Sequence, residues 1–129
     1  MAWLKPTDLS SARDIVSKSG SYSLGIAADG RFTFSITASG GSTPAVLSTA
    51  TASANTTYHV VGTYDGTNLK LYVNGQPAGT QARSGAIVDT ANVLRIGQGS
   101  TFFQGTIDEV SLYTRPIDAT EAQSHYASR

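Results

Sequence analysis

The acidic and histidine side chains are the first candidates for catalysis in this sequence of 129 residues. Asp108 and Glu109 are the one adjacent acidic pair, and acid–base cleavage of a glycosidic bond needs two carboxylates that face one cleft. Neighbours on a strand point to opposite faces, so this pair does not meet that requirement. His59 lies within a predicted strand, and His125 lies near the C-terminus without a nucleophile motif nearby. These residues therefore predict that the protein is not an enzyme.

The composition argues against several other kinds of site. Lys and Arg number 9, as do Asp and Glu, and only 14% of residues are charged, so a basic nucleic-acid footprint is absent. The chain has no Cys, which excludes disulfides, thiolate zinc sites and Cys nucleophiles. No apolar run reaches the length of a signal peptide or a membrane span. We therefore expect no nucleic-acid partner, no membrane span and no signal peptide in this chain.

The segment Tyr58–Gly75 predicts two paired strands and two tight turns. The turns lie at Asp65–Asn68 and at Asn74-Gly75, because Asp-Gly and Asn-Gly tolerate the positive φ angles of hairpins. Side chains alternate along the second strand, so its residues divide between two faces. The inward face is predicted to hold Leu69, Leu71 and Val73, and the outward face Lys70, Tyr72 and Asn74.

The same period of two runs through most of the chain. Trp3 and Leu4 open a first strand that ends at Pro6. Two further strands have inward apolar rows, formed by Tyr22, Leu24 and Ile26 and by Phe32, Phe34 and Ile36. The other predicted strands after the first cover Arg13–Lys18, Ala45–Thr49, Pro77–Ala82, Val93–Gly97 and Gly105–Tyr113.

The C-terminal segment contains a change of phase and a helix start. Ile107 and Val110 have opposite parity, so either a bulge lies between them or Ile107 packs on the other face. Asp118 and Glu121 fit a capping box, and Ile117 is expected to pack onto Ala122 at the start of a short helix that runs to Tyr126. Short strands with one terminal helix predict an all-β antiparallel sandwich, formed as one domain over residues 1–129.

Four segments, in their order along the chain, resemble the laminin-G-like jelly rolls of the concanavalin A-like lectin/glucanase superfamily. They are Ala2–Pro6, Tyr58–Gly75, Leu94–Gly97 and Phe103–Pro116. The resemblance implies a jelly-roll β-sandwich with a short C-terminal helix. Typical members have several dozen residues before the strand that holds Trp3, so we expect an N-terminally shortened domain. Such a domain should have at least one unpaired sheet edge.

The resemblance also implies a non-catalytic, lectin-like module that binds carbohydrate or mediates adhesion outside the cell, on a cell surface or on a virion. Sugars dock on exposed aromatic faces beside polar side chains. The predicted ligand-binding residues are Tyr72, Lys70, Asn74 and Phe102. Further candidates are Tyr22 and Tyr64, if exposed, and the loop residues Asn68, Asn92 and Gln98.

Two alternatives stay open. In the family, the Asp that corresponds to Asp108 often helps to hold a structural calcium ion, but Asp108 could instead accept backbone hydrogen bonds. The domain could also be a structural module, in which identical chains form a homo-oligomer through unpaired edge strands. The expected partner is accordingly a glycan, a surface protein or a second copy.

Overall fold

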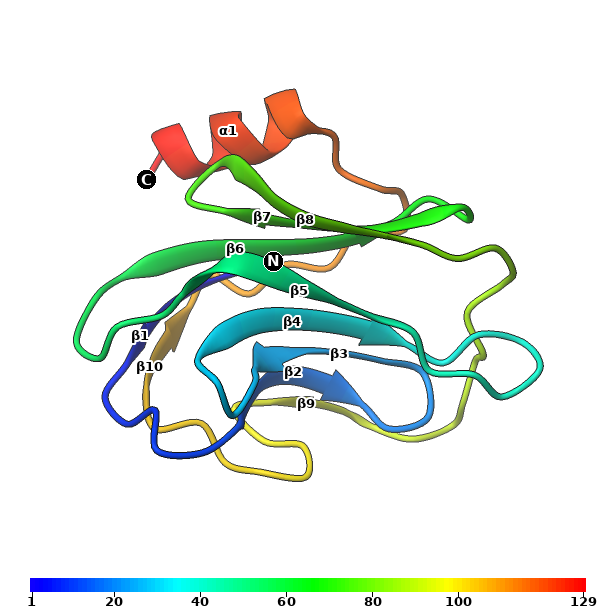
Figure 1. Cartoon of the computed structure of the whole chain (residues 1–129), viewed down its shortest axis with the longest axis horizontal. Coiled ribbons are helices and arrows are strands. Elements are labelled where there is room, and N and C mark those ends of the chain that lie inside the picture. The colour runs from blue at the N-terminus through cyan, green and yellow to red at the C-terminus, as the bar shows by residue number, and fades with distance from the viewer.

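The computed structural model describes all residues from Met1 to Arg129 and contains ten strands and one helix (Figure 1). The strands are β1 (Ala2–Pro6), β2 (Arg13–Lys18), β3 (Tyr22–Ile26), β4 (Arg31–Ile36), β5 (Ala45–Thr51), β6 (Tyr58–Tyr64), β7 (Asn68–Val73), β8 (Gln76–Ala82), β9 (Leu94–Ile96) and β10 (Gly105–Asp108). They form two antiparallel five-stranded sheets, in the orders β10-β1-β6-β7-β8 and β5-β4-β3-β2-β9. The predicted antiparallel sandwich is confirmed.

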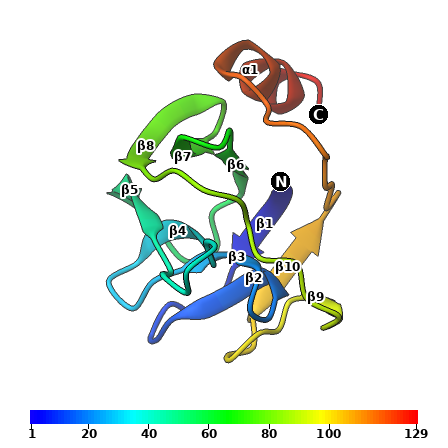
Figure 2. The ribbon, with the colours of Figure 1, turned by 90° about the vertical axis from the view of Figure 1, so that its right-hand side faces the viewer.

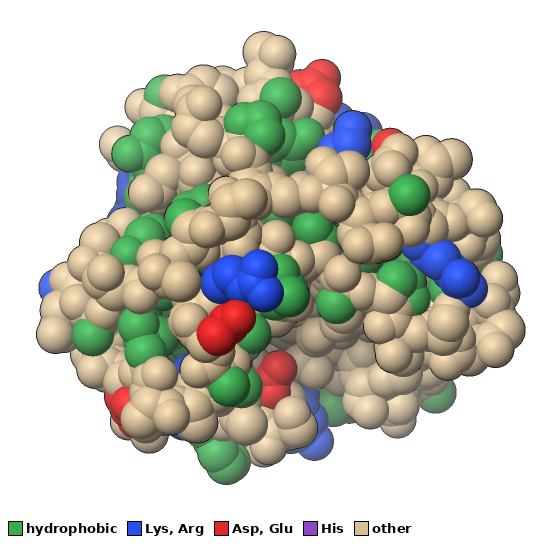
Figure 3. Space-filling model, in the orientation of Figure 1, with side chains coloured by type: hydrophobic (Ala, Val, Ile, Leu, Met, Phe, Trp, Pro, Cys, Tyr) green, Lys and Arg blue, Asp and Glu red, His purple; other side chains and the backbone are tan.

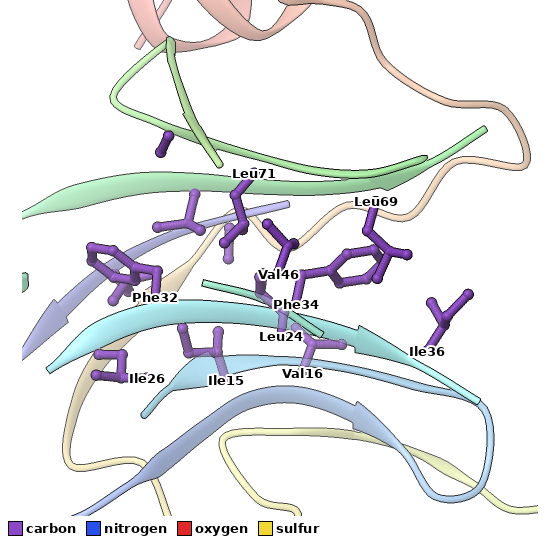
Figure 4. Close-up of a cluster of buried hydrophobic side chains, with 14 of the residues drawn as sticks. Ile15, Val16, Leu24, Ile26, Phe32, Phe34, Ile36, Val46, Leu69 and Leu71 are labelled. Carbon is purple, nitrogen blue, oxygen red and sulfur yellow. The ribbon is translucent and has the colours of Figure 1, made fainter. Parts of the chain in front are cut away.

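The core lies between the two sheets, where the inward rows of both meet. Phe32, Phe34 and Ile36 alternate with half-buried polar residues along β4, as the period of two predicts. Leu69 and Leu71 of β7 are fully buried opposite them (Figure 4). Burial of these side chains stabilises the sandwich by about 25 cal/mol for each Å² of apolar surface removed from water.

Two glycines allow the sheets to approach closely. A Cβ on Gly62 of β6 would lie 2.6 Å from ring atoms of Phe34, so only glycine leaves room for that ring. A Cβ on Gly79 of β8 would lie 2.6 Å from the carbonyl oxygen of Leu47 on β5. The β5 and β8 edges therefore close onto each other, while β9 and β10 lie at the other side (Figure 2).

The last strand is shorter than the sequence predicted, because β10 ends at Asp108. Glu109 adopts a left-handed backbone conformation, with φ of 50°, and this residue interrupts the alternation. Ile107 and Val110 consequently both pack against the core in spite of their opposite parity. The change of phase is therefore a local kink and not a switch of Ile107 to the outer face.

The helix α1 (Ala119–Ala127) covers the outer face of the first sheet (Figure 1). The predicted capping box is confirmed: Asp118 accepts from the Glu121 backbone N–H at 2.8 Å, and Glu121 accepts from the Asp118 N–H at 3.3 Å. Ile117 and Ala122 bury themselves against Val61 and Tyr72 of the sheet. The helix thus removes part of the outer face from solvent.

Candidate functional site

The outward row of β7 is not a free binding face. Tyr72 does point away from the core, but its side chain is only 5% exposed because Ile117 and Ala122 lie over it. Asn74 uses its Oδ1 atom to accept the His59 backbone N–H at 2.9 Å. Lys70 is half-buried in the middle of the strand. The prediction that Tyr72 offers an exposed ring is wrong, since the C-terminal helix packs on that ring.

Asp108 is an exposed side chain with two hydrogen-bond partners. Its Oδ1 accepts the Glu109 backbone N–H at 2.9 Å, and its Oδ2 lies 3.3 Å from the Arg129 guanidinium. The structure contains no group of three His, Cys, Asp or Glu side chains arranged to hold a metal ion. Calcium takes six to eight oxygen ligands, which include backbone carbonyls and waters as well as carboxylates.

A polar hollow lies instead on the outer face of the second sheet, and we call it the serine hollow. It has a volume of about 600 Å³ and is lined by residues of β2, β3 and β4, by the residues around β9, and by connecting loops. Its lining hydroxyl side chains are Ser17, Ser19, Ser21, Ser23, Ser35, Thr37, Thr43 and Ser100. This volume is within the range of ligand pockets, about 300–1,000 Å³.

The strand register explains why these serines meet. Ser17 pairs with both Arg95 and Ser23, and Ser23 pairs in turn with Ser35. Residues directly opposite in an antiparallel sheet share a face, so the four side chains form one row across four strands. The hydroxyl oxygens of Ser23 and Ser35 lie 2.8 Å apart. Small side chains along the row leave space above the sheet.

One wall of the serine hollow is a loop that Asp14 holds in place. The Asp14 Oδ2 atom accepts from the backbone N–H and the hydroxyl of Thr101, at 2.9 and 3.0 Å, and from the Ser100 hydroxyl at 3.3 Å. A Cβ on Gly99 would lie 2.6 Å from that oxygen and 3.0 Å from the Ser17 hydroxyl. Gly99 therefore allows the loop to lie directly against β2.

Two cationic side chains, Lys18 and Arg95, also line the serine hollow. Lys18 pairs with Asp89 at 3.2 Å, and the Arg95 guanidinium donates to the Gln98 side chain at 3.2 Å. Arg95 has no carboxylate partner among the ion pairs of the structure. On the face that Figure 3 shows, charged side chains are few and uncharged atoms cover most of the surface.

Phe102 is an exposed aromatic residue that directly follows the loop held by Asp14. Its side chain is 65% exposed, and it forms an antiparallel bridge with Gln98, which lines the serine hollow. Paired residues of an antiparallel bridge have their side chains on the same face. Phe102 therefore shares a face with Gln98, although it does not line the serine hollow itself.

Sequence reasoning identified part of this site. Asn92 and Gln98 were predicted as polar loop candidates, and both line the serine hollow, as does Tyr22. Asn68 and Tyr64 lie elsewhere, and the Tyr64 hydroxyl donates to the Arg83 carbonyl at 3.1 Å. The row of Ser17, Ser23 and Ser35 was missed. The signal was present, since Ser23 and Ser35 each lie between two apolar residues of an alternating strand, and Ser17 follows Val16 in β2.

Residues 1–123 match the family model described as "Concanavalin A-like lectin/glucanases superfamily". No curated protein matches this chain in sequence. No helix of the structure has the length and apolar character needed to cross a membrane.

Three similar solved structures illustrate the fold. The IT-sialidase CBM40 of Ruminococcus gnavus, bound to alpha2,3 sialyllactose, has a TM-score of 0.80 at 16% identity, over 97% of this chain and 79% of that one. The native heptameric SAP-like pentraxin of Limulus polyphemus has a TM-score of 0.72 at 19% identity, over 97% and 67%. The binding domain of Paraclostridial Mosquitocidal Protein 1 has a TM-score of 0.74 at 15% identity, over 98% and 36%. The chain spans little more than a third of the length of the first two solved structures that it matches. It covers 38% of one and 36% of the other.

Proposed function

The chain belongs to the concanavalin A-like lectin/glucanases superfamily, and we propose that it is a non-catalytic, lectin-like module that binds carbohydrate in the serine hollow. The observation that carries this proposal is the row of serine hydroxyls across three strands, which Arg95 of a fourth strand continues, in a hollow of about 600 Å³. A module of this kind acts outside the cell or on a surface, where glycans are found.

The chemistry of the serine hollow suits a sugar. Each serine hydroxyl donates one hydrogen bond and accepts others, so it can pair with a sugar hydroxyl in either direction. Lys18 and Arg95 add positive charge to the lining, and Phe102 offers an exposed ring next to Gln98, its bridge partner. A structurally similar module is bound to sialyllactose, so acidic sugars belong at the head of any panel of test ligands.

The number and the hydrogen bonds of the carboxylates in the serine hollow support the proposal that the module is not catalytic. A glycosidase uses two carboxylates about 5–10 Å apart, one on each side of the bond that breaks. Among the residues that line the serine hollow, Asp14 is the one carboxylate, and three hydrogen bonds commit its Oδ2 atom to the wall. Asp14 is therefore a structural acceptor in this proposal.

Glycan binding tests the proposal directly. A glycan array followed by titration calorimetry should find at least one sugar ligand for the unaltered chain. Ser23→Leu fills the centre of the row, and it should weaken that sugar at least about ten-fold, because it removes a polar contact and the space for the ligand. Thr80→Leu on the exposed part of β8 is the matched control and should leave affinity unchanged. Absence of any sugar ligand, or equal loss in both variants, would refute the serine hollow as the site.

Calcium binding at Asp108 stays a prediction from the family resemblance. If a site exists, millimolar calcium should raise the melting temperature relative to chelator, because an ion that binds only the folded state stabilises it. Asp108→Asn should abolish that rise, and Asp29→Asn, a second exposed acid in a turn, should keep it. Identical melting curves with calcium and with chelator would contradict the predicted calcium site.

The alternative function is a structural module that assembles through its sheet edges. The observation that favours this function is that β9 and β10 each lie at the end of a sheet and have a neighbouring strand on one side only. Sedimentation velocity over a range of concentrations distinguishes the two functions. A stable oligomer without sugar binding would support the structural module.

A further inference from the structure

The edge strand β9 presents unpaired backbone groups along one side. The Gly97 N–H donates to the Ile15 carbonyl at 2.7 Å, and Ile96 pairs with Val16. This pattern places Ile96 at a non-hydrogen-bonded position, so its own N–H and C=O point away from β2, as do those of Leu94 two residues before. The second sheet ends at β9, and these groups have no strand beside them.

The two faces of β9 also carry different kinds of side chain. Leu94 and Ile96 share one face and are 40% and 55% exposed, although they extend the inward apolar row of the sheet. Val16, the cross-strand neighbour of Ile96, lines an apolar cavity of about 270 Å³ between the sheets, together with Leu112 and Tyr113. Arg95 points to the opposite, polar face. The edge is therefore apolar on its inward face, cationic on its outward face and without a further strand along its backbone.

The charge of Arg95 decides which strand can complete this edge. The antiparallel register that pairs all outward groups of two β9 strands places Arg95 directly opposite Arg95 of a second copy, and like charges in that position repel. An acidic side chain in the same position attracts the guanidinium, which has no carboxylate partner of its own. Apolar side chains on either side of the acid would lie beside Leu94 and Ile96.

We propose that β9 is a docking edge for an extended strand of a partner protein, in which one acidic residue lies between two apolar residues. The strand adds to the second sheet by backbone hydrogen bonds, and its side chains give the specificity. The acid pairs with Arg95 on the polar face, and the apolar pair covers the open side of the sandwich. Arg95 also lines the serine hollow, but this inference does not require that a sugar binds there.

Peptide titration tests the proposal. The probe is a short fluorescein-labelled peptide of alternating threonine and valine with one central glutamate, and a second peptide has lysine in its place. Fluorescence anisotropy should show tighter binding of the glutamate peptide. Amide NMR signals of Leu94 and Ile96 should shift on binding. Arg95→Glu should reverse the preference, by about three-fold in each direction, which is typical of one cross-strand charge pair.

Two further variants control for the fold and for charge. Leu94→Pro removes an outward N–H that the fold does not use, so the chain should stay folded and lose the peptide. Lys5→Glu changes the net charge by the same amount as Arg95→Glu but lies on the first sheet, and it should keep the original preference. Binding of neither peptide, no preference between them, or a dimer through β9 that the peptide does not dissociate would each overturn the proposal.

Discussion

At the scale of single residues, His59 is the buried group whose environment opposes its charge. Its side chain is 1% exposed, its Nδ1 atom has no hydrogen-bond partner, and its ring lies 4.9 Å from that of Trp3. Burial lowers the pKa of His59 from 6.5 to about 4, and the positive charges of the Met1 amino group, His125 and Arg129 add to this effect. The folded protein therefore keeps this imidazole neutral.

The pH dependence of stability follows from the lowered pKa of His59. The unfolded chain binds a proton here below pH 6.5, and the folded chain binds it only near pH 4, so acid favours unfolding. The free energy of unfolding should be highest above pH 6.5 and fall by up to about 3 kcal/mol between pH 6.5 and 4. Urea denaturation at several pH values measures this change. His59→Phe should remove most of the dependence in that window, and an equal slope in wild type and variant would contradict the assignment.

Gly62 shows how one missing side chain shapes the core. Its position in β6 leaves space that the Phe34 ring fills. Gly62→Ala should lower the free energy of unfolding by about 2 kcal/mol, because the new methyl group overlaps that ring. Phe34→Leu provides the control: in its background the same alanine should cost about half as much. Urea denaturation of the wild type, the two single variants and the double variant completes the cycle, and additive costs would rule out the contact as the cause.

At the scale of elements, α1 begins at a cap that ties the helix to the preceding loop. The Arg115 guanidinium donates to both carboxylate oxygens of Glu121, at 2.8 and 2.6 Å, and this pairing lowers the pKa of Glu121 to about 2. Glu121 therefore stays ionised and keeps its bond to the Asp118 N–H well into acid. The helix start is stabilised from both sides of the capping box.

Removal of the cap should loosen the helix without unfolding the sandwich. Asp118→Ala leaves the Glu121 N–H without its acceptor and should cost about 1 kcal/mol, with a loss of helical signal in circular dichroism. Asp89→Ala removes the same charge from an exposed loop and serves as the control. Equal effects of the two substitutions would show that charge, and not the cap, is responsible.

At the scale of the whole molecule, the two ends of the chain meet on one face of the first sheet. Trp3 of β1 stacks against Tyr126 of α1 with ring centroids 5.7 Å apart, and the Arg129 guanidinium lies 4.4 Å from the Trp3 ring. Arg129 also pairs with Asp108 on the neighbouring β10. The C-terminal segment thus contacts both β1 and β10, the first and last strands along the chain.

Trp3 is the one tryptophan of the chain and reports on this contact. Tyr126→Ala should shift its fluorescence emission to longer wavelength and increase quenching by acrylamide, because the ring loses its cover; stability should fall by about 1 kcal/mol. Tyr113→Ala removes an exposed ring that contacts His125 and not Trp3, so its emission should not change. An unshifted spectrum in Tyr126→Ala would show that other atoms shield the tryptophan.

Much of the fold was predictable because its signals are local. The inward rows of β3 and β4, the turns of Tyr58–Gly75 and the capping box at Asp118 each depend on residues a few positions apart. The site was less predictable. Asn92, Gln98 and Phe102 were named from their types, but the row of Ser17, Ser23 and Ser35 required the register of three strands.

The sequence by itself therefore determined the strands, their inward faces and the start of the helix, since side-chain period, turn residues and caps act between near neighbours. Only the tertiary structure decided which outward face stays open. The helix α1 covers Tyr72, while the small side chains of Ser17, Ser23 and Ser35 leave the serine hollow free. The physical reason is that cover by a distant segment depends on long-range packing, which a strand's own alternation does not encode.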